Sequence, residues 1–235
     1  MRLVPLLVWL AGGALAATLA VGAVRNGIWP PAEKAVISYS AAFVGITVGV
    51  IVWQLRPDSR TGVLLTAFPL VYLLSELWVV FSGSALAVTI GFAANWLSAP
   101  VFGHMVLSYP TGRLRYRLDR ALVAVAYAFG VTAGLVTIVF FDPRRPWTGT
   151  ITWFQPHAAA ITHIPGSVAA GLPDAFDKAI LPLAVLFIPL LVRKIVRSTP
   201  GGRRVVLPLA VAAGFTAVQV LVQFALVGAS GNAAW

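Results

Sequence analysis

The sequence has no cysteine and few charged side chains. Without cysteine it offers no disulfide framework, no thiolate metal site and no thiol nucleophile. Charged residues are 10% of the 235 positions, well below the share in a typical soluble domain. Nucleophile elbows, phosphate-cradling glycine loops, His-Glu pairs and paired carboxylates are also missing from the sequence. We therefore expect no enzyme active site and no cofactor in this chain.

What the chain has in excess is apolar surface, with 59% hydrophobic residues and a mean hydropathy of +0.89. A soluble domain of this size cannot bury several long apolar runs, whereas a bilayer core calls for about 20 residues per helical span. We predict an all-α, polytopic membrane bundle of about seven transmembrane helices in the plasma membrane. The expected spans are about 3–24, 35–55, 63–81, 85–109, 121–141, 179–192 and 205–227.

Two of these spans have competing interpretations. The first could be a secretory signal peptide, but its apolar run is longer than the usual core of about 7 to 15 residues. The sixth is short and contains Pro182 and Pro189. It spans if Lys178 and Arg193 snorkel outward, or if residues from Leu172 onward join the helix.

The distribution of Lys and Arg predicts the orientation. The formal net charge is +10, but the cations lie in short clusters between apolar runs, which indicates topology signals and not a nucleic-acid site. If Arg2 is cytoplasmic, twelve of the 17 Lys and Arg residues fall in inner segments. We therefore expect a cytoplasmic amino terminus, an external carboxyl terminus, and anionic lipid headgroups as partners at the inner face.

The segment 142–178 is then an extracytoplasmic loop, rich in proline and in aromatic residues such as Trp147 and Trp153. It is either an aromatic belt that anchors a linker or a place for an external ligand. His157 and His163 in this loop could bind zinc together, but two ligands without cysteine or a nearby carboxylate pair make a weak site. We expect no metal.

Glu76 is the acidic residue within a span, where a carboxylate costs roughly 2.5 to 3.5 kcal/mol and needs a partner. Counted from the inner ends of their spans, Glu76 and Asn95 lie at the same depth and could hydrogen-bond. The pair is either a clasp that serves packing or a proton-sensing or ligand-binding site. His104 completes the candidate intramembrane polar site, although it lies well below Glu76 and has no second histidine in a span.

The sequence leaves open whether the protein forms a homodimer. Two small-residue patterns, Gly45 with Gly49 and Gly130 with Gly134, occur about as often as chance allows in a chain with 21 glycines.

Two inner loops carry distinctive motifs. The first contains an Arg-Pro turn, and the second a Tyr-Pro turn in which Pro110 ends a helix and Gly112 permits the turn. Both are at least tight connectors that set topology. The motif residues are Arg56, Pro57 and Gly62, and Pro110, Gly112 and Arg113.

Together the loops resemble the amino-terminal membrane region of actinobacterial sensor histidine kinases. In that family an Arg-Pro turn leads to Gly-x-Leu-Leu, and a later His precedes Phe-Pro or Tyr-Pro and x-Gly-Arg-Leu. Here Gly62-Val63-Leu64-Leu65 and His104 with Tyr109-Pro110-Thr111-Gly112-Arg113-Leu114 match, and the resemblance covers residues 35–130. It implies a membrane input region that feeds a cytoplasmic phosphoacceptor and ATP-binding core.

The chain departs from that pattern because it contains no phosphoacceptor box and no ATP-binding segment. A cytoplasmic kinase behind a cytoplasmic amino terminus also needs an even number of spans. We therefore expect an eighth helix and a kinase core beyond this chain. The alternatives are a small multi-pass transporter or permease subunit that uses Glu76 and Asn95, and a membrane scaffold or accessory protein.

Overall fold

The computed structural model describes residues 3–28, 32–141, 172–198 and 200–231. Within these ranges the chain is helical or in turns, and no strand occurs, as the sequence predicts. The helices are α1 (Leu3–Arg25), α2 (Ala32–Leu55), α3 (Thr61–Ser75), α4 (Leu77–Val80), α5 (Ala85–Ser108), α6 (Arg117–Phe140), α7 (Leu172–Ala179), α8 (Leu181–Val196) and α9 (Pro200–Gly231).

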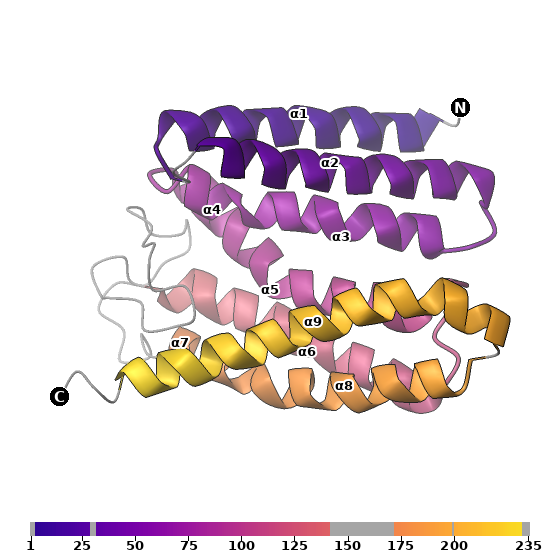
Figure 1. Ribbon diagram of the computed structural model, residues 1–235. Coiled ribbons are helices and arrows are strands. Elements are labelled where there is room, and N and C mark those ends of the chain that lie inside the picture. Colours follow the sequence, from indigo (N-terminus) through magenta and orange to yellow (C-terminus); the bar gives the residue numbers. More distant parts are fainter. Residues whose placement is uncertain (1–2, 29–31, 142–171, 199, 232–235) are drawn as a thin grey trace.

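The long helices lie side by side and alternate in direction (Figure 1). The α2–α3, α5–α6 and α8–α9 connections lie at one end of the bundle, which we call the basic end (residues 56–60, 109–116 and 197–198). The end of α1, the start of α2 and the α4–α5 connection lie at the opposite end (Figure 1). Local sequence explains the boundaries of α5, because the Ser84 hydroxyl caps its start and Pro110 follows its end.

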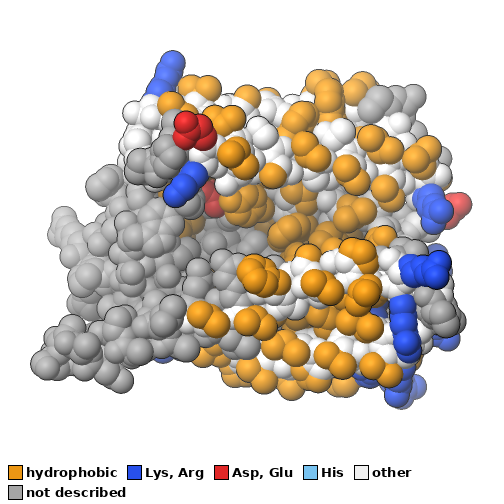
Figure 2. Space-filling view, in the orientation of Figure 1, with side chains coloured by type: hydrophobic (Ala, Val, Ile, Leu, Met, Phe, Trp, Pro, Cys, Tyr) orange, Lys and Arg blue, Asp and Glu red, His pale blue; other side chains and the backbone are white. Residues whose placement is uncertain are grey.

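Five helical segments among the described residues are long and apolar enough to cross a bilayer: α1, residues 33–55 of α2, α3 with α4, α5 and α6. The chain is therefore a multi-pass helical protein of the membrane class. Its surface agrees with this class, because large side chains such as Leu7, Val44 and Leu135 are more than half exposed. Orange side chains cover the middle of the bundle, and Lys and Arg gather at the basic end (Figure 2).

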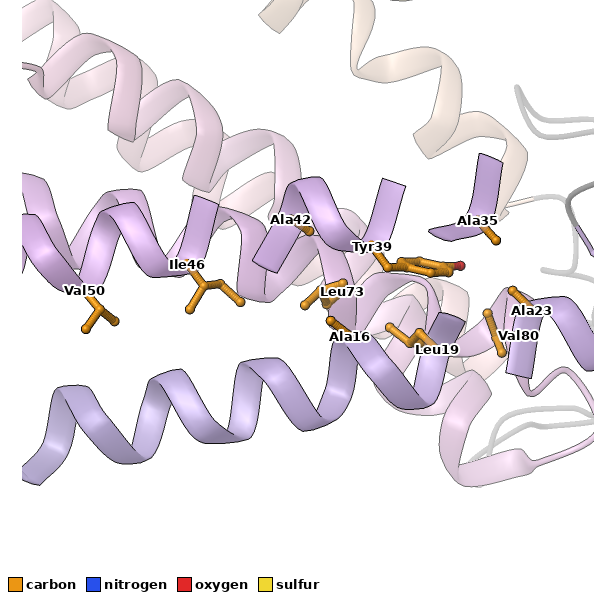
Figure 3. Close-up of a cluster of buried hydrophobic side chains, with 10 residues drawn as sticks. All are labelled: Ala16, Leu19, Ala23, Ala35, Tyr39, Ala42, Ile46, Val50, Leu73 and Val80. Carbon is orange, nitrogen blue, oxygen red and sulfur yellow. The ribbon is translucent and has the colours of Figure 1, made fainter. Parts of the chain in front are cut away.

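The core of the first half of the bundle lies between α1, α2 and the α3–α4 segment (Figure 3). Tyr39, Ile46 and Leu73 are fully buried in this cluster, and Ala16 and Ala23 of α1 allow the helices to approach closely. This packing places Tyr39 of α2 beside the point where α3 gives way to α4.

Close helix contacts use the glycines of the two small-residue patterns. A Cβ at Gly49 would lie 2.5 Å from the backbone nitrogen of Thr66 on α3. A Cβ at Gly130 would lie 2.5 Å from the carbonyl oxygen of Trp96 on α5. Both glycines therefore serve contacts within the chain and leave no free groove for a second copy at these positions.

The structure differs from the expected spans in the third span and in the segments from Leu172 onward. The third stretch, expected as 63–81, is divided at Glu76 into α3 and α4, with Pro69 inside α3. The end of the expected loop 142–178 is helical, because α7 covers Leu172–Ala179 and α8 begins at Leu181. α8 has 16 residues and α9 begins at Pro200, five residues before the expected 205. His157, His163 and the aromatic part of the loop lie outside the described residues.

Candidate functional sites

Glu76 lies at the junction of α3 and α4. Its backbone N–H is shared between the carbonyl oxygens of Tyr72 and Leu73, each at 3.2 Å. The Tyr39 hydroxyl of α2 donates a hydrogen bond to Glu76 Oε2 at 3.2 Å. Tyr72, one turn earlier on α3, lies beside this carboxyl. The carboxyl thus has a hydrogen-bond donor at a helix break, as a partly buried polar group requires.

The partner differs from the one expected. No Glu76–Asn95 hydrogen bond occurs among the described residues, and the Asn95 carbonyl oxygen accepts a hydrogen bond from the Ser98 hydroxyl at 2.7 Å. Equal depth along two helices does not determine which way each side chain faces around its helix axis. The same counting does find Tyr39, because it lies 16 residues before the end of α2 and Glu76 lies 15 after the start of α3.

His104 belongs to a different contact. Its Nδ1 lies 3.4 Å from the Tyr127 hydroxyl of α6, and the two rings meet edge to face with centroids 5.9 Å apart. The pair joins α5 to α6. His104 therefore has Tyr127 as its partner, in agreement with the expectation that it lies too far from Glu76 to pair with it. No group of metal-binding side chains is found among residues 3–28, 32–141, 172–198 and 200–231.

The two motif loops of the basic end are joined directly, and we call this contact the loop clasp (Ser59 and Thr61 with Pro110 to Gly112). The Thr61 hydroxyl donates to the Pro110 carbonyl oxygen at 2.6 Å. The Ser59 hydroxyl donates to the Thr111 carbonyl oxygen at 3.1 Å. The loop clasp therefore ties the α2–α3 hairpin to the α5–α6 hairpin across 49 and 52 residues of sequence.

Glycine makes this approach possible. Gly112 has φ +70, and a Cβ on it would press against the backbone nitrogen of Thr61 and lie 2.6 Å from the carbonyl carbon of Arg60. Gly62 fits against the backbone of Trp53 on α2, where a Cβ would also collide. Two of the six motif residues thus have a steric reason to be glycine.

The loop clasp is surrounded by positive charge. A hollow between the two loops is lined by the exposed side chains of Arg56, Arg113, Arg115 and Arg120, with Asp58 the acid among its lining residues. The Arg120 Nε donates to the Leu114 carbonyl oxygen at 3.1 Å, which leaves most of these guanidinium donors directed to the surroundings. Such a surface attracts anions in proportion to its excess charge.

The α8–α9 hairpin is anchored at the same end by contacts that sequence reasoning missed. Arg193 of α8 pairs with the buried Asp119 of α6. The Lys194 ammonium donates to the carbonyl oxygens of Val106, at 2.8 Å, and Leu107, which are left open by the end of α5. The sequence does not indicate a buried ion pair at Asp119, because Asp119 lies two residues before the apolar stretch 121–141, in a segment expected to be a loop.

Comparison with known proteins adds no family assignment: no protein-family model, curated protein or solved structure has significant similarity to the chain.

Proposed function

We propose that this chain is the membrane-embedded input region of a two-component sensor histidine kinase, which senses a stimulus and itself catalyses nothing. The observation that carries the proposal is the loop clasp. The motifs that resemble the kinase family lie 49 and 52 residues apart, yet they contact each other through Thr61 with Pro110 and Ser59 with Thr111. Connectors that set topology alone have no need of such a contact.

The proposal links the Glu76 site to the loop clasp through one helix. α3 begins at Thr61, which donates to Pro110, and ends at Ser75, directly before Glu76. A change in the hydrogen bond between Tyr39 and Glu76 therefore acts at one end of the helix whose other end carries Thr61. A protonated carboxyl donates as well as accepts, so proton uptake changes which contacts this helix break can make.

We further propose seven spans, with α8 and α9 crossing after the five long apolar segments, and with the basic end in the cytoplasm. Support comes from the gathering of Lys and Arg at the basic end (Figure 2). In this orientation the exposed arginines around the loop clasp meet the anionic headgroups of the inner leaflet. Each such cation contributes about 1 kcal/mol of attraction.

Cysteine labelling tests this topology, because the sequence has no cysteine to give a background. Gly83→Cys and Gly201→Cys are sterically safe, since a Cβ at either position meets nothing within 4 Å. In intact cells we expect an impermeant maleimide to label Gly83→Cys but not Gly201→Cys or Asp58→Cys, and to label all three after permeabilisation. Labelling of Gly83 and Gly201 from the same side would show that α8 does not cross.

The Glu76 site is tested with a fluorophore attached to Asp58→Cys, beside the loop clasp. We expect the emission to change with pH in the otherwise native chain and to stay constant after Glu76→Gln, because the amide cannot take up a proton. Glu33→Gln is the matched control, since Glu33 is exposed in the first turn of α2. A pH response that survives Glu76→Gln would remove Glu76 from the sensing mechanism.

The coding sequence that follows Trp235 tests the kinase assignment. We expect an eighth apolar helix, then a helix with His-Glu or His-Asp, then ATP-binding segments. A stop codon at that point, with no kinase core encoded beside it, contradicts the proposal. Proton or solute flux in vesicles that is lost in Glu76→Ala would then assign a transporter, and the absence of flux would leave the scaffold role.

A further inference from the structure

An apolar cavity lies between the two halves of the bundle. Its volume is about 340 Å³, within the range of small-molecule sites, and α3, α5, α6, α8 and α9 all contribute to its wall. Aromatic side chains from four of these helices surround it: Phe68, Trp96, Phe102, Phe129 and Phe187.

The polar side chains in the wall already have partners. Trp96 Nε1 donates to the Thr137 hydroxyl at 2.8 Å, and the Ser98 hydroxyl donates to the Asn95 carbonyl oxygen at 2.7 Å. Tyr72 lies beside the Glu76 carboxyl. A polar ligand would therefore lose its hydration without gaining hydrogen bonds, so the wall selects a hydrocarbon group.

The cavity lies at the depth of the bilayer's hydrocarbon core. Its wall begins near the basic end, where Leu107 is one residue from the end of α5 and Leu122 is five residues from the start of α6, or about 8 Å along the helix. Ala217 at its upper edge is 17 residues from the start of α9, or about 26 Å. Lipid chains are the solvent at this depth, so the available hydrocarbon group is an acyl chain.

Cations gather at the basic end, just below the cavity. The guanidinium carbons of Arg193, Arg197 and Arg115 lie 4.9, 5.6 and 6.0 Å from the centroid of the Tyr116 ring. We call these four residues the Tyr116 cluster. Asp119 neutralises Arg193, so two positive charges remain in excess. The Arg193 Nε is a buried donor without an acceptor in the part of the chain that the structure describes.

We propose that this arrangement binds one anionic phospholipid, with an acyl chain in the cavity and the phosphate at the Tyr116 cluster. An acyl chain gains no free energy when it leaves the acyl chains of the bilayer, so the selectivity of the site comes from the phosphate. The acyl chain fills a space whose walls would otherwise lose packing contacts. The lipid site does not depend on the proposed sensor-kinase function, because binding a lipid requires no signalling step.

The headgroup is tested in nanodiscs of equal parts phosphatidylglycerol and phosphatidylcholine, with bound lipid counted by native mass spectrometry after release. We expect the full chain to retain phosphatidylglycerol preferentially. Arg197→Gln should lower this retention about fivefold, the effect of one cation near an anionic headgroup. Arg25→Gln, an equal charge change at an exposed arginine at the opposite end of the bundle, should leave it unchanged. Equal losses in both variants would indicate diffuse attraction and overturn the site.

The acyl chain is tested by filling the cavity. Ala126 and Ala184 line the cavity, so Ala126→Leu and Ala184→Leu would each place a larger side chain in it. Ala128→Leu is the matched control, because Ala128 lies on the exposed face of α6. We expect at least one cavity variant that keeps the native unfolding transition to lose the bound lipid, and the control to keep it. Neither inorganic phosphate nor a short-chain phosphatidylglycerol should displace the lipid. Displacement by phosphate alone, or unchanged retention in folded cavity variants, overturns the proposal.

Discussion

Replacing Gly112 with alanine is expected to destabilise the protein by about 3 kcal/mol. The left-handed conformation of residue 112 costs an alanine about 1 to 2 kcal/mol. The new methyl group would also press on the backbone of Arg60 and Thr61, where nothing can rotate away, and forced shifts of this kind cost about 1 to 3 kcal/mol. The measurement is the free energy of unfolding in mixed micelles titrated with denaturing detergent.

Gly83→Ala is the matched control for this substitution. Gly83 also lies in a connection between helices, but a Cβ there meets nothing within 4 Å. Its replacement should change the free energy of unfolding by less than about 0.5 kcal/mol. If Gly112→Ala were equally harmless, the loop clasp would not hold the two hairpins together, and the main support for the proposed sensor function would be lost.

The loop clasp shows what the sequence can and cannot predict. The separate motifs predict two tight turns, because proline ends a helix and glycine permits a positive φ, and Gly112 has that conformation. Their mutual contact joins Thr61 to Pro110, 49 residues away. No periodicity or turn rule reports on such a distance, so the contact becomes visible only when the helices between the loops are placed.

The Glu76 site was predictable in part for a related reason. The cost of a carboxyl group at bilayer depth indicates that Glu76 has a partner, and helix rise restricts the partner to residues at similar depth. Rise does not tell which of Tyr39 and Asn95 faces it, because that depends on rotation about the helix axes. The break at Glu76 adds a further change of direction that the apolar stretch 63–81 conceals.

The second half of the bundle was the hardest to predict. Hydropathy finds α8 weakly because it has 16 residues and an internal Pro189. Its position depends on charged side chains near its end, and loop cations are normally interpreted as topology signals. Arg193 and Lys194 instead bind specific partners on α6 and α5. The cavity follows from this anchoring and from five helices at once, so no single stretch of sequence indicates it.

The ion pair between Asp119 and Arg193 carries the second large effect. Asp119 is 6% exposed, so Asp119→Ala leaves the Arg193 guanidinium in a largely buried position without its counter-charge. Breaking a fully buried pair costs about 3 to 5 kcal/mol. Because the Arg193 side chain is 24% exposed, water recovers part of this, and we expect a loss of about 2 kcal/mol. The free energy of unfolding of the variant in mixed micelles measures it.

A double-mutant cycle separates the pair from the other contacts of Arg193. Arg193→Ala also removes the approach to the Tyr116 ring, at 4.9 Å, so the single variants are not equivalent. If the pair anchors α8, Asp119→Ala combined with Arg193→Ala should cost less than the sum of the two, with a coupling of about 1 kcal/mol or more. The exposed Asp58→Ala should cost less than about 0.5 kcal/mol. Additive losses around the cycle would mean that Lys194 and the apolar contacts of α8 hold the hairpin without the ion pair.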